Sequence, residues 1–370
     1  MADTHGSEDT THELEVSPGL VTVRGRVDIT TLPLEIIQMI GKIMLTEDLV
    51  RVIQSCKALY GQLTYVLYRR MVAANNHHNA IVHCILRNRA TPLSRFLDAG
   101  AILDNGAARE YHATAIATCD KNAGFLSKHP LVSAASLGHA EIVRLLLRRA
   151  EAVTWQSRTV IKFSALLEAI KHGHVEVVRI LVDAGVDLRG SSTSRLQPTI
   201  PLVLAATHKS IDMVKIITAK MRAETETYRA QTYFSQCGHA LRAAIQADSH
   251  EIVEFFLRDG LHPNASRTTE SFLYTAATTT PSSYNRTVIV KLLMAYGAST
   301  VKSDPGLIKA SWNKNFEVVN HVLTEGCDWK YKMREVRWAR LMAENEGQQD
   351  VVQLWNEYVD QRIRDGGDMA

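Results

Sequence analysis

The chain has 370 residues, of which 46% are hydrophobic and 22% charged, a balance typical of globular proteins. Its formal net charge of +3 argues against charge-driven binding to nucleic acid or to a membrane surface. No apolar run approaches the ~18 residues of a membrane span, and the length allows two or three ordinary domains or one long repeat array.

Residues 1–30 are predicted to form a disordered acidic tail, because acidic residues outnumber basic ones there and no helical pattern begins. The first fifteen residues lack the basic and apolar regions of a secretory signal. The five cysteines are scattered without a Cys-x-x-Cys pair, which indicates reduced thiols. These features predict a cytoplasmic or nuclear protein without a membrane partner.

Residues 31–72 are predicted to form a small domain of three short helices. Pro33 stands where a first helical turn accepts proline, and Glu35 lies near the positive end of that helix. A second helix is expected from Thr46 and a third over residues 57–69. Apolar residues at helical spacing form one face of the first helix: Ile36, Ile37, Ile40 and Ile43.

This segment resembles an F-box. The resemblance rests on a Leu-Pro pair, a glutamate, two aliphatic residues, an Asp-Leu pair and a cysteine with an aromatic residue four positions on: Leu32, Pro33, Glu35, Ile36, Ile37, Asp48, Leu49, Cys56 and Tyr60. It lacks the proline that many F-boxes have before Asp48, and it has Tyr60 where tryptophan is common. The resemblance implies docking to the Skp-type linker of a cullin-RING ubiquitin ligase through six family positions: Leu32, Pro33, Ile36, Ile37, Leu49 and Val52.

Residues 79–360 contain about eight copies of one unit, and residues 361–370 form a tail. The clearest copies span residues 129–153 and 164–188, with Leu131 and Leu166 in equivalent places. Each predicts a short helix, a Gly-His turn and a longer helix whose apolar stripe is too wide for a lone surface helix. Residues equivalent to Leu131 recur along the chain: Ile81, Leu131, Leu166, Leu202, Leu241, Leu273, Leu307 and Ala339.

The repeat resembles the ankyrin repeat, whose period is about 33 residues. The predicted fold class is therefore all-α, an ankyrin-repeat solenoid preceded by a small three-helix F-box-like domain. The Thr-Pro-Leu-His opening of the family survives only in part, at residues 129–131 and 200–202. Because the histidine of that opening is replaced, we expect an array without a recurrent polar contact between neighbouring turns. Insertions are predicted at residues 102–128, 222–236 and 278–286.

The sequence offers no pattern of catalytic or metal-binding residues. A Gly-rich phosphate loop, a Gly-x-Ser-x-Gly elbow and a His-Glu-x-x-His motif are all absent. His78 and His83 lie near Cys84, but five positions apart they do not share a helix face. Histidines in the predicted turns are interpreted as structural: His139, His172 and His174. We expect no enzyme activity, cofactor, metal or small-molecule substrate.

Residues 329–340 combine five basic residues, one acidic residue and three aromatic residues. Such enrichment is typical of protein interfaces and of nucleic-acid patches. We expect Trp338 to pack under the last helix, with its charged neighbours solvated. We expect Trp329 and Tyr331 to contact a target protein.

The combined resemblance implies a substrate-recognition adaptor of an SCF-type ubiquitin ligase. The F-box would bind the Skp-type linker and the array would bind an unidentified target protein. The alternative is an ankyrin scaffold or regulator outside the ligase system, in which residues 31–72 are a helical N-terminal cap. A nucleic-acid binder acting through residues 329–340 is a third hypothesis, which the near-neutral net charge disfavours.

Overall fold

The computed structural model describes ten stretches of the chain: residues 29–74, 78–101, 129–151, 158–188, 200–224, 230–265, 271–279, 284–298, 306–324 and 333–364. All regular secondary structure in these stretches is helical. None of their helices is both long and apolar enough to cross a bilayer. The chain divides into two compact units, Met1–Arg70 and Met71–Ala370. The predicted tail lies outside the described stretches up to residue 28, and the 3-10 helix η1 (Ile29–Thr31) follows it.

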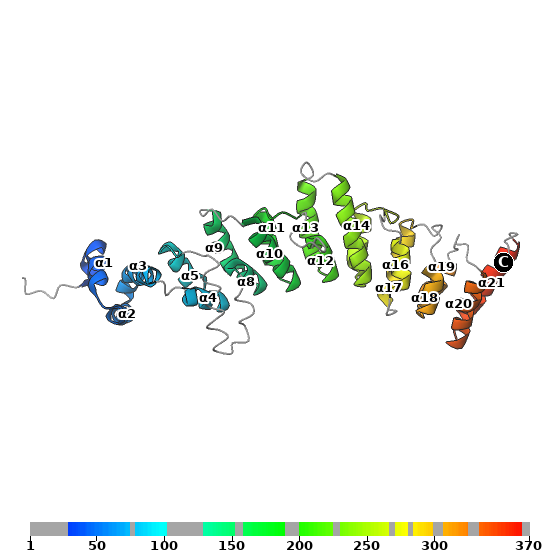
Figure 1. Ribbon diagram of the computed structural model, residues 1–370, viewed down its shortest axis with the longest axis horizontal. Coiled ribbons are helices and arrows are strands. Elements are labelled where there is room, and N and C mark those ends of the chain that lie inside the picture. Colours follow the sequence, from blue (N-terminus) through cyan, green and yellow to red (C-terminus); the bar gives the residue numbers. More distant parts are fainter. Residues whose placement is uncertain are drawn as a thin grey trace, which may run out of the picture. The chain divides into compact units, whose positions relative to one another are not determined.

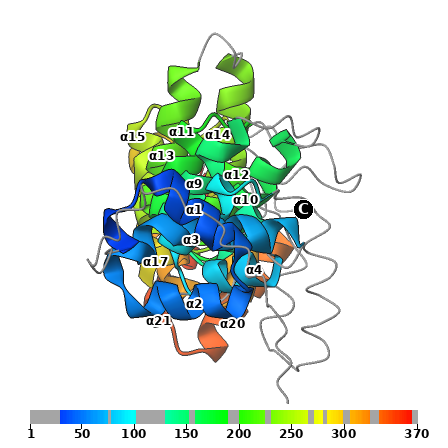
Figure 2. The ribbon, with the colours of Figure 1, turned by 90° about the vertical axis from the view of Figure 1, so that its left-hand side faces the viewer.

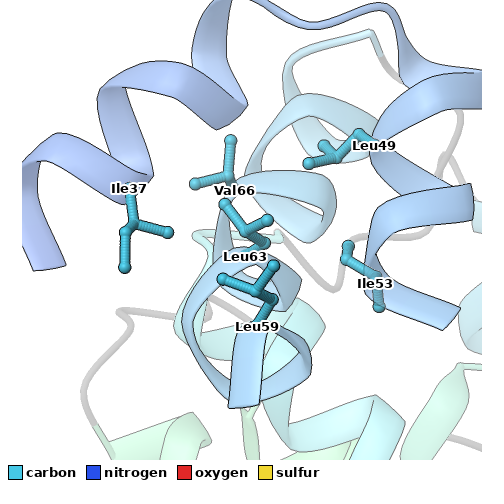
Figure 3. Close-up of a cluster of buried hydrophobic side chains, with 6 residues drawn as sticks. All are labelled: Ile37, Leu49, Ile53, Leu59, Leu63 and Val66. Atoms are coloured by element: carbon cyan, nitrogen blue, oxygen red, sulfur yellow. The ribbon is translucent and has the colours of Figure 1, made fainter. Parts of the chain in front are cut away.

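The first unit is built from α1 (Leu34–Ile43), α2 (Thr46–Ser55) and α3 (Lys57–Ala73). The helix α3 extends beyond Arg70, the last residue of this unit. Pro33 precedes α1 in an extended conformation, and Glu35 lies in the first turn, as the sequence predicted. Side chains from all three helices form one buried cluster (Figure 3): Ile37, Leu49, Ile53, Leu59, Leu63 and Val66. The three-helix prediction is therefore correct for this segment.

Arg70 of α3 holds the C-terminal end of α1. Its guanidinium donates to the carbonyl oxygens of Met44 at 2.8 Å, Lys42 at 3.0 Å and Gly41 at 3.2 Å. The last carbonyls of a helix have no partner within that helix, so a cation there satisfies them and complements the helix dipole. Arg70 thus fixes the direction of α1 against α3 across the small core.

The second unit contains eight successive pairs of helices in its described stretches. In chain order these pairs are α4 (His78–Leu86) with α5 (Ala90–Asp98), α8 (Pro130–Ser136) with α9 (Ala140–Glu151), α10 (Arg158–Lys171) with α11 (Val175–Asp183), α12 (Pro201–Thr207) with α13 (Ile211–Ala223), α14 (Ala230–Gln246) with α15 (His250–Arg258), α16 (Phe272–Thr278) with α17 (Tyr284–Ala295), α18 (Gly306–Trp312) with α19 (Phe316–Thr324), and α20 (Met333–Asn345) with α21 (Gln349–Arg364).

Neighbouring pairs stack in chain order, so that first helices pack on first helices and second helices on second helices (Figure 1). The residues equivalent to Leu131 lie where these layers meet. All of them are at most 2% exposed: Ile81, Leu131, Leu166, Leu202, Leu241, Leu273, Leu307 and Ala339. The repeat therefore places one apolar anchor per unit in a continuous core, which is how a stack of short helix pairs becomes stable.

Polar contacts do recur between neighbouring units, contrary to the sequence prediction. His174, just before α11, donates from Nε2 to the carbonyl of Ser136 at 2.9 Å. Asn315, just before α19, donates from Nδ2 to the carbonyl of Ala277 at 3.0 Å. His139, which precedes α9, interacts with the backbone of Leu86 in the preceding unit. For His174 and Asn315, the residue before a second helix satisfies a carbonyl near the end of the preceding unit's first helix.

These contacts come from the residue before each second helix and not from the family's usual histidine in the first helix, so the repeat pattern did not predict them. A further contact uses an arginine: Arg286 of α17 is 2% exposed and donates to the carbonyl of Ile245 at 2.6 Å. Its guanidinium lies 3.6 Å from the Asp248 carboxylate. Burial lowers the pKa of Arg286, and the charge of Asp248 opposes that shift.

The insertion predicted at residues 222–236 is largely helical where it is described. The end of α13 and the start of α14 extend beyond the neighbouring helices (Figures 1 and 2). Arg222 and Tyr233 meet there, and the Tyr233 hydroxyl donates to the Asp259 carboxylate at 3.1 Å. Arg222 also pairs with Asp259. Burial raises the pKa of the neighbouring Cys237 thiol to about 11, so this cysteine stays a buried thiol.

Candidate partner-binding surfaces

The first unit carries an exposed apolar surface on and beside α1. We call these five side chains, each at least 43% exposed, the α1 surface: Leu34, Ile36, Met39, Ile43 and Leu45. Ile43 is 84% exposed although it belongs to a folded helix, and Leu45 is 74% exposed. Ile36, Met39 and Ile43 share one side of α1 at helical spacing, and apolar side chains grouped in water mark contact sites for other molecules.

The apolar residues of α1 face two directions, whereas the sequence predicted one face. Ile37 points into the core (Figure 3), where Gly41 lets α3 approach closely. A β-carbon at Gly41 would lie 2.7 Å from the Leu63 side chain. Ile36 and Ile43 point away from that core and are exposed. One side of α1 therefore holds the unit together and the other is available to a partner.

The six predicted linker contacts occupy different environments. Ile37 and Leu49 are 1% and 0% exposed and belong to the unit's own core, so direct contact with a partner is corrected to a structural role for these two. Leu32 and Val52 are partly buried against the same core. Pro33 and Ile36 are exposed. Of the predicted set, these last four retain surface that a partner could reach.

Met39 and Leu45 were missed by the sequence analysis. Met39 lies three residues after Ile36 and four before Ile43, so helical spacing alone could have placed it on the same side. Leu45 precedes α2 in an extended conformation. No periodic pattern could identify it, because its exposure follows from the direction in which α1 ends.

In the second unit, the prediction for Trp338 is wrong. Trp338 lies on α20 and is 52% exposed, and Trp312 on α18 is 55% exposed. The tryptophan that packs with the last helix is Trp355, which belongs to α21 itself and is 0% exposed. Trp329 and Tyr331 lie outside the described residues, so their contact with a target stays a prediction.

Comparison with known families matches residues 70–192 and 131–230 to the model for ankyrin repeats in three copies. The chain contains ankyrin repeats. Two solved structures are similar to this chain. The ankyrin repeat domain of human ASB11 is 22% identical, with 57% of this chain and 91% of that chain covered and a TM-score of 0.44. The ankyrin repeat domain of Bcl-3, a member of the IkappaB family, is 20% identical, with 62% of this chain and 98% of that chain covered and a TM-score of 0.47. The comparison with curated proteins gave no match.

Ankyrin repeats bind other proteins through the surface that the stacked units present, so the second unit is a protein-interaction module. Its turn histidines take part in packing: His174 makes the contact to Ser136 described above, and the rings of His172 and His174 stack at 6.2 Å.

The segment around Cys84 belongs to α4. Cys84 is buried in α4, and burial raises the pKa of its thiol, which opposes formation of the reactive thiolate. In the described stretches, no group of three or more His, Cys, Asp or Glu side chains could hold a metal ion.

Proposed function

We propose that the protein is a substrate-recognition adaptor of an SCF-type ubiquitin ligase, acting in the cytoplasm or nucleus. In this proposal the first unit binds the Skp-type linker and the ankyrin repeats hold a target protein. The observation that carries the proposal is the α1 surface, because its side chains are exposed on a helix that the Ile37–Leu63 core and Arg70 already hold in place.

An amphipathic partner helix would gain stability by covering this surface. Fully burying one Leu, Ile or Met side chain contributes about 1.5–3 kcal/mol. The most exposed members, Met39, Ile43 and Leu45, have the most area left to bury. Loss of translational and rotational freedom opposes binding, so several of these side chains must act together. Replacing two of them by glutamate should therefore abolish binding rather than weaken it slightly.

The test uses the full chain and the purified Skp-type linker in a pull-down and a titration. Met39→Glu combined with Ile43→Glu should lose binding, while the thermal unfolding midpoint stays close to that of the parent because both side chains are exposed. A matched control is Phe234→Glu, which changes a 51% exposed aromatic residue of α14 in the repeat unit. This control should bind the linker normally.

A second variant tests the positions that the resemblance supplied. Leu32→Ala combined with Pro33→Ala should weaken linker binding, since both lie next to the start of α1. If the parent protein does not bind the linker, or if both double variants bind it as the parent does, the adaptor proposal fails. The scaffold alternative, in which the first unit is a cap, would then be preferred.

A further inference from the structure

A pocket lies between the first helices of the last two units, α18 and α20, which pack against each other. It has a volume of about 640 Å³ and is lined by Trp312, Arg334, Glu335, Trp338 and Met342. This volume is within the range of ordinary ligand pockets. Two half-exposed indoles and a thioether give it an apolar, polarisable wall that suits an aromatic side chain.

Basic side chains of α20 lie at this pocket. Arg334 lines it, and Arg337 is exposed on the same helix. Neither arginine forms an ion pair with another residue of the described stretches. On α18, Lys309 donates to the hydroxyl of Tyr274 on α16 at 3.3 Å, so its ammonium group is held toward α16 and does not line the pocket.

The acidic residues of the same region are mostly paired already. Glu344 lies 3.3 Å from Arg340, and Glu346 lies 2.7 Å from Lys314. Glu335 is the acid that lines the pocket itself. Arg334 and Arg337 therefore outnumber Glu335, and the charges of α20 beside the two tryptophans are predominantly positive.

We propose that this pocket binds an acidic peptide segment anchored by one aromatic side chain, presented by the target protein. The aromatic ring would insert between Trp312 and Trp338, and flanking carboxylates would pair with Arg334 and Arg337. This inference rests on the proposed role of the repeats in holding a target, and it is independent of the ligase role of the first unit.

A peptide fits these observations better than a nucleic acid. Binding of a nucleic acid depends on neutralising many phosphates along a basic track. Here the positive charge is confined to the rim of one pocket, whose wall includes Met342 and a carboxylate, Glu335. An open apolar pocket with charges at its edge is an arrangement found at the anchor residues of protein interfaces.

The test is fluorescence anisotropy with labelled probes and the full chain. The first probe is a synthetic peptide with a central phenylalanine flanked by glutamates. The second replaces that phenylalanine by alanine, and the third replaces the glutamates by lysines. A fourth probe, single-stranded oligothymidylate, represents nucleic acid. We expect binding of the first probe, at least tenfold weaker binding of the others, and weakening with added salt.

Three variants assign that binding to the pocket. Trp312→Ala and Trp338→Ala should each raise the dissociation constant of the acidic phenylalanine peptide about tenfold or more. Arg334→Glu should weaken the acidic peptide and strengthen the lysine peptide, a reversal that loss of folding cannot produce. Phe234→Ala removes an exposed aromatic residue from α14 and should leave binding unchanged.

The proposal is overturned if the acidic phenylalanine peptide does not bind, if oligothymidylate binds more tightly, or if the tryptophan variants bind as the parent does. Thermal melts of each variant accompany the titrations. The same preparations are assayed for Skp-type linker binding. Loss of peptide binding with intact linker binding refutes only this pocket, and the opposite pattern refutes only the adaptor role.

Discussion

Gly138 and Gly173 occupy the same turn position in successive units, with φ angles of +76° and +78°. Their surroundings differ. A β-carbon at Gly138 would lie 2.6 Å from Nδ1 of His174. A β-carbon at Gly173 would have no neighbouring side chain or backbone atom within 4 Å. The first glycine therefore serves both the backbone conformation and a close approach by the next unit, and the second serves the backbone alone.

We therefore predict that replacing glycine by alanine lowers the free energy of unfolding by different amounts at the two positions. Gly173→Ala should destabilise by about 1 kcal/mol, because a left-handed conformation costs an L-residue about 1–2 kcal/mol and the stiffer unfolded chain offsets part of this. Gly138→Ala should cost at least about 1 kcal/mol more, because it also displaces His174 from its bond to Ser136. Urea titrations of both variants measure the difference. Equal losses would mean that His174 moves aside freely.

The neighbouring His139 should make stability depend on pH. Burial lowers its pKa most, the charge of His174 lowers it further, and the bond to the Leu86 backbone raises it in part. A histidine with a lowered pKa binds fewer protons when folded than when unfolded. Its contribution is therefore complete above the ordinary histidine pKa of about 6.5 and is lost as pH falls below that value.

His139→Asn tests this while keeping a hydrogen-bond donor, since Asn315 occupies the equivalent position before α19. As the pH falls from 7.5 to 5.5, the melting temperature should decrease less in the variant than in the parent. Other groups titrate over the same range, so the comparison is the difference between the two proteins. The same decrease in both would show that His139 is not the titrating group.

At the scale of the element, second helices hold the stack through buried aliphatic side chains. Leu146 of α9 and Leu181 of α11 are 0% exposed. Replacing either by alanine should cost about 2–5 kcal/mol, as buried leucine truncations do. Arg148→Ala, an exposed change on α9, is the control and should stay within about 0.5 kcal/mol. Chemical unfolding of the three variants provides the measurement, and a small loss at both leucines would contradict the assigned packing.

At the scale of the whole molecule, the repeat unit should not unfold as one block. Each pair contacts mainly its sequence neighbours, so local stability follows the quality of each interface. The pairs α8–α9 and α10–α11 combine buried anchors, polar contacts and glycine turns. Hydrogen exchange should therefore be slowest between residues 129 and 188. Uniform protection across residues 80–360 would show that the array unfolds cooperatively.

Much of the fold was predictable because its determinants are local. Helical spacing and the recurrence of an apolar anchor such as Leu131 or Leu241 identify the helix pairs, and each anchor is buried as predicted. The contacts between units were less predictable. His174 and Asn315 differ in chemistry, but each lies before a second helix and bonds to an equivalent backbone carbonyl of the preceding unit. Only the structure shows that the two residues make equivalent contacts.

The sequence by itself determined the class of fold, the order of its helices and the buried anchors. Apolar residues recur with a period of about 3.6 residues within each helix, and the helix pair recurs about every 33 residues, so both patterns can be read without the tertiary structure. Tertiary structure alone decided which apolar side chains remain outside. Ile37 and Ile43 belong to one helix, and Trp338 and Trp355 to consecutive helices, yet one of each pair is buried and the other exposed. Apolar side chains can lie on more than one side of a helix, and only the position of its packed neighbours determines which side loses contact with water.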